Sequence, residues 1–316
     1  MITTVSICLA CHKEIPAVIE ETWDGVFMTQ KCPVCGDKKA IVEESVAFHK
    51  AFGYRRNKKT FNSLMLDITD ACNTNCKLCY HPRSDTHKGI IEILRTAAKY
   101  SNRNIWLSGG EPTCHPELFN IISCMSNFKT LITNGHAFAD MRYLQEFIEL
   151  TGDKKEFPCE ISINPNPHKL TLECLSNLRS LGKTIDCGMF SISSLRNIEK
   201  SLDIWGQWLD VVTNARIRTP FNVWGQQANK TLFMSEVYKE VISHIPRFVI
   251  TEDLGGNSIY NINLKADRYL SLCSAPNRNA FDVLAVSNAP DMLADDNNIY
   301  PIPYGLMVNE FIGDVS

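Results

Sequence analysis

Three cysteines in one short loop are the residues of this chain best suited to chemistry. Cys72, Cys76 and Cys79 have the spacing C-x3-C-x2-C. Structural zinc takes four protein ligands, and catalytic zinc takes three together with a water molecule. A [4Fe–4S] cluster is normally held by four cysteine thiolates. If this loop supplies only three thiolates, one iron stays open to bind another molecule, and chemistry can occur at that iron.

A second motif follows about thirty residues after the cysteine loop. The apolar segment Asn104–Leu107 is soon followed by Gly109, Gly110, Glu111 and Pro112. This order is typical of a strand that ends in a loop. Because glycine has no side chain, the pattern predicts a loop whose backbone approaches a ligand closely.

Taken together, the two motifs resemble those of the radical S-adenosylmethionine (SAM) enzymes. The resemblance implies that the three cysteines hold a [4Fe–4S] cluster, that SAM chelates the fourth iron, and that Gly109–Pro112 binds the SAM amino group. One position departs from the family pattern. Leu78 stands before the third cysteine, where an aromatic residue is common, and Tyr80 follows that cysteine. This departure concerns the contact with adenine more than the cluster.

The alternative for the three cysteines is a zinc loop with a distant fourth ligand. His81 and His87 are the nearest histidines that could complete such a site. A zinc loop would leave the Gly-Gly-Glu-Pro motif unexplained.

The first forty residues contain a second set of cysteines. Cys8 and Cys11 form one C-x2-C pair, and Cys32 and Cys35 form another. Four thiolates at this spacing predict a closed tetrahedral site for Zn²⁺ or a rubredoxin-type iron. The intervening residues predict two short strands joined by a Trp-Asp-Gly turn. This ribbon serves either as a metal staple for a small segment or as an electron relay or substrate lid.

A covalent haem site is a further alternative, because residues 8–12 also read Cys-x2-Cys-His. Haem attachment would leave Cys32 and Cys35 without a role and would require an exported protein. We therefore favour the four-cysteine metal site.

Length and composition place the chain among cytoplasmic globular proteins. It has 316 residues, a net charge of −3 and 13 cysteines. We expect neither a membrane span nor nucleic-acid binding, because long apolar runs and a strongly basic balance are both lacking. Many cysteines without a secretory signal favour metal ligation and free thiols in a reducing compartment.

An alternation of strand-like and helix-like segments begins at residue 64 and repeats six times. It predicts the α/β class, with a parallel sheet curled into a partial (β/α)6 TIM-type barrel of the kind the resembled family has. Ligands of such folds bind beyond the carboxyl ends of the strands, where both motifs fall. The expected strands are Leu64–Thr69, Asn104–Leu107, Thr130–Thr133, Glu160–Ile163, Thr184–Ile192 and Val211–Ile217.

We expect four parts along the chain. They are a metal ribbon (1–45), a linker (46–63), the barrel (64–245) and a C-terminal β extension (246–316) that covers the open end of the barrel. The linker contains the basic run Arg55–Lys59. Short strands are expected at Arg247–Thr251, Ser258–Leu264 and Tyr269–Cys273. Beyond Cys187 only Cys273 follows, so a C-terminal auxiliary cluster is not expected.

Polar residues at the later strand ends are further candidates for the site. The resemblance places Thr133 and Asn134 near SAM, although this Thr-Asn-Gly segment could also be an ordinary turn. It places polar groups such as Ser162 and Asn164 near the ribose. Arg216 and Arg218 could bind the SAM carboxylate or form a structural salt bridge. Cys114 is a weak candidate for a hydrogen donor, and a buried inert thiol is its simpler interpretation.

The resemblance implies an enzyme that cleaves SAM reductively and makes a 5′-deoxyadenosyl radical. This radical would abstract hydrogen from a small-molecule or lipid substrate, leading to methylation, C–C bond formation or rearrangement. A flavodoxin or ferredoxin-type protein would supply the electron. The ribbon ahead of the barrel resembles the dihydropterin methylases and tetraether lipid synthases. An iron–sulfur electron-transfer protein and a zinc-ribbon binding module are the two alternatives.

Overall fold

The computed structural model describes most of the first 244 residues and short segments beyond them. The described residues are 1–8, 11, 13–52, 63–76, 79, 84–219, 232–244, 251–253, 259–264, 268–273, 291–293 and 299–301. Several sequence predictions therefore lie outside the described residues. These are the basic run 55–59, residues 247–250 of the strand expected at Arg247–Thr251, and the roles considered for His12, Leu78, Tyr80 and His81.

An antiparallel sheet forms the N-terminal ribbon. Within residues 1–43 its strands are β1 (Ile2–Ile7), β2 (Glu14–Thr22), β3 (Gly25–Cys32) and β4 (Gly36–Glu43), paired in that order. Gly25 has a φ of 142° and lets the chain turn between β2 and β3. Thr22 closes this turn by donating a hydrogen bond to the Gly25 carbonyl at 2.9 Å. Alternate residues such as Val26 and Met28 of β3 are buried, as expected of a sheet with one covered face.

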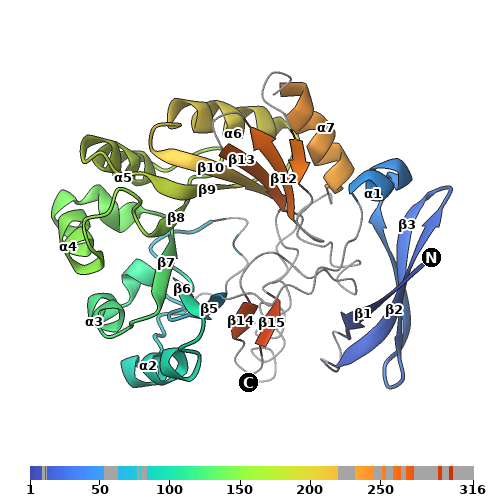
Figure 1. The fold of residues 1–316 in the computed structure, drawn as a ribbon, viewed down its shortest axis with the longest axis horizontal. Helices are drawn as coiled ribbons and strands as arrows, with labels where there is room; N and C mark the ends of the chain where they lie inside the picture. The colour runs from blue at the N-terminus through green and yellow to red at the C-terminus, as the bar shows by residue number, and fades with distance from the viewer. Residues whose placement is uncertain are drawn as a thin grey trace.

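The barrel is a curved parallel sheet with helices on its outer face (Figure 1). Its six strands pair in chain order, and every pairing is parallel. The strong alternation of strand and helix patterns in the sequence predicted this arrangement, and the α/β partial-barrel class is confirmed. The strands are β5 (Ser63–Asp67), β6 (Asn104–Ser108), β7 (Phe128–Thr133), β8 (Cys159–Ser162), β9 (Ile185–Ser191) and β10 (Val212–Arg218).

The helices pack on the outside of this sheet and bury its main hydrophobic core. Leu64, Ile105, Leu131 and Ile161 from four successive strands are fully buried in this core. Each burial removes apolar surface from water and so stabilises the fold. The helices are α2 (Ile90–Lys99), α3 (Leu118–Ser123), α4 (Met141–Thr151), α5 (Lys169–Ser180), α6 (Arg196–Gln207) and α7 (Met234–His244), with the short turns η1 (Pro112–Cys114) and η2 (His136–Ala139).

Helix α1 (Val46–Phe52) lies between the ribbon and α7 (Figure 1). Phe48 of α1 belongs to the main core, and its ring is 5.4 Å from the ring of Tyr238 on α7. On the ribbon side, His49 Nδ1 is 3.0 Å from a carboxylate oxygen of Glu21. Helix α1 therefore contacts both parts of the molecule.

The C-terminal strands extend the barrel sheet at both of its edges. β13 (Arg268–Cys273) pairs in parallel with β10, and β12 (Ile259–Leu264) and β11 (Thr251–Asp253) follow beyond it. At the other edge, β14 (Asp291–Leu293) pairs in parallel with β5 and carries β15 (Ile299–Pro301). In the described residues these strands continue the barrel sheet instead of forming a separate one. Where each of the four expected parts begins and ends stays a prediction.

Among the described residues, no helix has the length and apolar character needed to cross a membrane.

Candidate functional site

A cavity of about 540 Å³ lies at the carboxyl ends of the barrel strands. The cysteine loop after β5 forms one wall, and polar residues after the later strands form the others. Of the residues singled out in the sequence, those that line this cavity are Cys72, Cys76, Cys79, Gly109, Gly110, Glu111, Thr133, Asn134, Ser162, Asn164 and Arg218. The parallel topology brings them together, because all of these strand ends meet at one edge of the sheet.

Three residues that the sequence suggested for the SAM or catalytic site are not among the described residues that line this cavity. Pro112 is buried at the start of η1, where it fits the first position of a helical turn. Cys114 ends the same turn, and burial is the main cause that raises the pKa of its thiol. Arg216 lies deeper along β10, where its guanidinium is 3.0 Å from a carboxylate oxygen of Glu160. This is the salt bridge that the sequence left open as an alternative.

Sequence reasoning missed part of the wall formed by β9 and the segment after it. Ser191, Ser193 and Asn197 line the cavity, and so does Asn166 after β8. The sequence signal that could have identified these residues was their position at or soon after the ends of buried strands. Serine and asparagine are common in ordinary turns as well, so residue type alone did not distinguish them.

The two glycines of the Gly-Gly-Glu-Pro motif allow the cysteine loop to pack against the end of β6. A β-carbon on Gly109 would lie 2.2 Å from the Thr69 carbonyl oxygen, and one on Gly110 would lie 2.5 Å from the Ala71 carbonyl oxygen. The backbone N–H of Gly110 donates to Thr69 at 2.7 Å, and that of Glu111 donates to Ala71 at 2.8 Å. The sequence predicted that the backbone of these glycines approaches a ligand closely. In the structure, the backbone of the cysteine loop lies this close to Gly109 and Gly110.

Glu111 is buried and accepts hydrogen bonds from two neighbouring segments. One carboxylate oxygen accepts from the Thr113 hydroxyl and the Thr133 hydroxyl, each at 2.7 Å. The other accepts from the backbone N–H of Asn134 at 2.7 Å. Burial raises the pKa of the Glu111 carboxyl, while these hydrogen bonds act in the opposite direction. The side chain therefore joins the ends of β6 and β7.

The cysteine loop is held at its base by hydrogen bonds. The Thr69 hydroxyl donates to the Thr86 carbonyl at 3.0 Å and accepts from the Ala71 N–H at 3.1 Å. Within the loop, the Thr74 hydroxyl lies 3.2 Å from the sulfur of Cys72 and 3.5 Å from that of Cys76. His87, one of the two histidines considered as a fourth ligand in the zinc alternative, is 2.7 Å from the Thr69 hydroxyl through its Nδ1 atom.

The sulfurs of the three loop cysteines are not all within 4.8 Å of one another. Among the described residues, the ligand atoms of only one set of cysteine, histidine and carboxylate side chains lie within 4.8 Å of one another, and that set is in the ribbon. A single zinc ion needs its ligands to converge, whereas a cubane cluster holds each thiolate on a different iron. The loop sulfurs are therefore spaced more widely than those of the closed four-cysteine site in the ribbon.

The wall opposite the cysteine loop carries hydrogen-bond donors. Asn164 has a φ of 64°, and its side-chain oxygen accepts a hydrogen bond from the Ser191 N–H at 3.1 Å. Because the Asn164 oxygen faces the Ser191 N–H, the Asn164 amide nitrogen points away from Ser191. The Arg218 guanidinium donates from Nε to the Ser191 hydroxyl at 2.7 Å. An acceptor-bearing or anionic group fits this wall.

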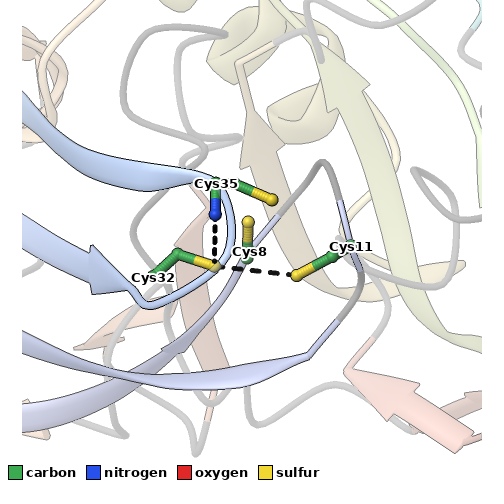
Figure 2. Close-up of side chains that lie close together, drawn as sticks. All are labelled: Cys8, Cys11, Cys32 and Cys35. Atoms are coloured by element: carbon green, nitrogen blue, oxygen red, sulfur yellow. Dashed lines mark hydrogen bonds between the residues drawn. The ribbon is translucent and has the colours of Figure 1, made fainter.

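The four ribbon cysteines form a compact metal-binding set (Figure 2). Four sulfurs about 2.3 Å from one zinc ion in a tetrahedron are about 3.8 Å apart. The sulfurs of Cys11 and Cys32 are 3.7 Å apart, and all four ligand atoms lie within 4.8 Å of one another. Because both C-x2-C pairs contribute, this geometry fits a single tetrahedral ion and not haem attachment through Cys8 and Cys11 alone.

Backbone groups prepare Cys32 to bind a cation. The N–H of Cys35 donates to the Cys32 sulfur at 3.3 Å, and this bond, with a second from Val34, lowers the pKa of Cys32 to about 7. The thiolate is the form that binds metal, so a lowered pKa favours ligation near neutral pH.

Comparisons with known proteins agree with the description of the ribbon and of the barrel. Residues 1–44 match the sequence family described as the HMPTM N-terminal zinc ribbon domain. The chain is 28% identical over 185 residues to 7,8-dihydro-6-hydroxymethylpterin dimethyltransferase of Methanocaldococcus jannaschii, which covers 46% of this chain and 36% of that protein. It is also 31% identical over 85 residues to a probable GTP 3′,8-cyclase of Methanosarcina mazei, covering 23% of this chain and 25% of that protein. The chain thus spans only about a third or less of these curated relatives.

Among solved structures, SuiB of Streptococcus suis bound to S-adenosylmethionine aligns with 90% of this chain and 81% of its own, at 14% identity and a TM-score of 0.49. The sequence comparisons confirm the expected recognition: this chain has an HMPTM-type zinc ribbon at its N-terminus and resembles the dihydropterin methylase branch of the radical SAM enzymes.

Proposed function

We propose that this chain is a radical SAM enzyme whose chemistry takes place in the cavity at the strand ends. The observation that carries the proposal is that Cys72, Cys76 and Cys79 line the same cavity as Gly109–Glu111 and the polar ends of the later strands. When bound, a [4Fe–4S] cluster with SAM on its open iron would supply a 5′-deoxyadenosyl radical that removes hydrogen from a substrate.

The residues of this chain would bind, orient and shield the cofactors. The three loop cysteines would hold the cluster, and the Gly109–Glu111 segment would meet the SAM amino group. Arg218 and Asn164 present donors from the opposite wall, which suits a carboxylate or another acceptor. Arg216 is not part of this proposal, because its guanidinium binds Glu160. The ribbon would hold Zn²⁺, or iron in the same geometry.

The substrate class is the finer part of the proposal. The relatives act, by their names, on a pterin and on GTP, and both compounds are small molecules with fused nitrogen heterocycles. These are therefore the first substrates to test, before peptides or lipids. A flavodoxin or ferredoxin-type protein in the cytoplasm would supply the electron.

Anaerobic reconstitution with iron and sulfide tests the proposal. The wild-type chain should take up about four irons at the loop, and with dithionite and SAM it should form 5′-deoxyadenosine. Cys76→Ala should abolish this product and leave the ribbon metal bound. Cys124→Ala is a matched control, because Cys124 is an exposed cysteine at the end of α3.

The two alternatives predict different results in the same assay. An electron-transfer protein would bind a cluster but form no 5′-deoxyadenosine. A zinc-ribbon binding module would bind metal through Cys8, Cys11, Cys32 and Cys35 and would take up no iron–sulfur cluster. Either result would contradict the enzyme proposal.

A further inference from the structure

We infer that Asn134 is a positioning residue that fastens the cysteine loop to β7, and that it is not a ligand of SAM. This inference rests on the proposed function, because it concerns the loop that would hold the cluster. It assigns to Asn134 a task different from the SAM contact that its motif implies.

The contact that suggests this role joins two asparagine side chains. The Asn134 amide nitrogen donates to the side-chain oxygen of Asn73 at 2.7 Å. Asn73 directly follows Cys72, the first cysteine of the loop. The hydrogen bond therefore connects the end of β7 to the residue beside a predicted cluster ligand.

The orientation of the Asn134 side chain is fixed by a second contact. Its side-chain oxygen accepts a hydrogen bond from the backbone N–H of His136 at 2.9 Å. A backbone N–H can only donate, so the oxygen must face His136 and the amide nitrogen must face Asn73. Both polar ends of the carboxamide are thus engaged by protein groups.

The backbone of Asn134 is also fixed on both sides. Its N–H donates to a carboxylate oxygen of Glu111 at 2.7 Å, and its carbonyl accepts from the Thr171 hydroxyl at 3.0 Å. The neighbouring Thr133 hydroxyl donates to the same carboxylate group at 2.7 Å. The end of β7 is therefore a rigid support from which one side chain reaches the cysteine loop.

The Asn134–Asn73 bond adds to the contacts at the base of the cysteine loop. The contacts of Thr69 and Ala71 with Gly110 and Glu111 fix the chain just before Cys72. The Asn134–Asn73 bond adds a point of attachment just after Cys72. A cysteine fixed on both sides would hold its sulfur in place before the cluster binds, which lowers the entropy lost on binding.

The test uses Asn134→Ala, Asn73→Ala and the double variant, with Asn102→Ala as control. Asn102 is an exposed asparagine in the loop between α2 and β6. Each chain is reconstituted anaerobically. We would measure the rate at which a chelator removes cluster iron, the electron paramagnetic resonance spectrum of the reduced cluster, and the KM for SAM.

We expect each single variant to lose iron about fivefold faster, which corresponds to one hydrogen bond of about 1 kcal/mol. The double variant should be no faster than either single variant, because both changes remove the same bond. The spectrum of the reduced cluster should change in both single variants, while the KM for SAM stays within about twofold of wild type.

Three outcomes would overturn the inference. Iron loss as slow as in wild type would show that the bond does not hold the loop. A raised KM for SAM with an unchanged cluster spectrum would assign Asn134 to SAM binding. Additive effects in the double variant would show that the two asparagines act separately. If the wild type itself takes up no cluster, the proposed function fails instead. The Asn134–Asn73 bond is then tested by hydrogen exchange of residues 70–76 in the metal-free chain. Unchanged exchange in Asn134→Ala would overturn the inference.

Discussion

Gly110 shows how one residue without a side chain determines the shape of the site. A β-carbon at this position would lie 2.5 Å from the carbonyl oxygens of both Asp70 and Ala71. These are backbone atoms of the cysteine loop, so they cannot move aside without moving the loop. Glycine is required here by packing and not by an unusual φ, because Gly110 is absent from the glycines with positive φ.

We therefore expect Gly110→Ala to displace the cysteine loop and prevent iron–sulfur uptake. Overpacking of this kind costs about 1–3 kcal/mol of unfolding free energy. Gly206→Ala is the matched control: nothing lies within 4 Å of its β-carbon position in α6, and alanine should stabilise a helix by about 0.5–1 kcal/mol. Iron content and urea unfolding measure both effects. Normal iron uptake by Gly110→Ala would disprove this view of the loop.

The Glu111 carboxyl should make stability depend on pH. Burial raises its pKa in the folded chain above the ordinary value of 4.5. The folded state then holds the proton more tightly than the unfolded state, so this group favours folding at low pH. That contribution is fully present below pH 4.5 and is lost as the pH rises through the folded pKa.

Glu111→Gln should remove this pH dependence, because glutamine does not titrate. We expect wild type to gain stability relative to Glu111→Gln as the pH is lowered towards 4.5. Urea unfolding at several pH values measures the difference. Three groups near Glu111 do not titrate in this range, since burial raises the pKa of Cys174 to about 12 and raises those of Cys159 and Tyr143 as well. A difference that is constant with pH would contradict the raised pKa.

At the residue scale, the sequence predicted cavity residues at the ends of β5, β6, β7, β8 and β10 but missed those at the end of β9. It also did not predict how deep each side chain lies. Arg216 and Arg218 lie two positions apart on β10 and so on the same face. Arg218 lines the cavity, and Arg216 donates a hydrogen bond to Glu160 of β8, deeper in the barrel. Arg218 is the last residue of β10, whereas Arg216 lies two residues before that end and so deeper in the barrel. Residue type alone did not show which of the two arginines reaches the cavity.

At the element scale, strands with strong apolar patterns were predicted within one or two residues. The barrel strand expected at Val211–Ile217 is β10, Val212–Arg218. In the ribbon, two strands were expected, and β1 and β4 were not. β4 contains Asp37, Lys38 and Lys39, which give it little strand character of its own. It becomes a strand because β3 offers hydrogen-bonding partners along its whole length.

The end of β4 also joins the ribbon to the barrel. The carboxylate of Glu43 is buried and accepts hydrogen bonds from the Ser235 backbone N–H at 3.2 Å, from the Ser235 hydroxyl and from the Ser45 N–H at 3.0 Å. Ser235 lies in the first turn of α7, where a negative charge is favoured by the helix dipole. The ribbon thus caps a barrel helix.

Glu43→Ala should destabilise the protein by about 1–3 kcal/mol, because it leaves buried donors without an acceptor. Glu44→Ala is the control, since Glu44 is the exposed residue next to it. Thermal and urea unfolding measure the cost. Equal stability of the two variants would show that the contact between Glu43 and Ser235 does not stabilise the protein.

At the scale of the whole molecule, the ribbon and the barrel are connected through α1. Glu21 of β2 contacts His49 and Lys50 on one side of this helix, at 3.0 Å and 3.6 Å. Phe48 on the same helix is buried in the main core with Val241 of α7. A change in the ribbon can therefore reach α7, while α4 and α5 lie on the far side of the barrel (Figure 1).

Loss of the ribbon metal should therefore loosen one side of the barrel and not the other. Cys32→Ser removes a buried metal ligand, and a small four-cysteine segment depends on its metal for folding. Hydrogen exchange should then rise in the ribbon, in α1 and in α7, and stay at the wild-type level in α4 and α5. Cys124→Ser, at an exposed thiol, should change neither region. If α7 exchanges as slowly in Cys32→Ser as in wild type, the metal stabilises the ribbon alone. If exchange in the ribbon itself also stays at the wild-type level in Cys32→Ser, the metal is not a staple, and a role for the ribbon as an electron relay or substrate lid is favoured.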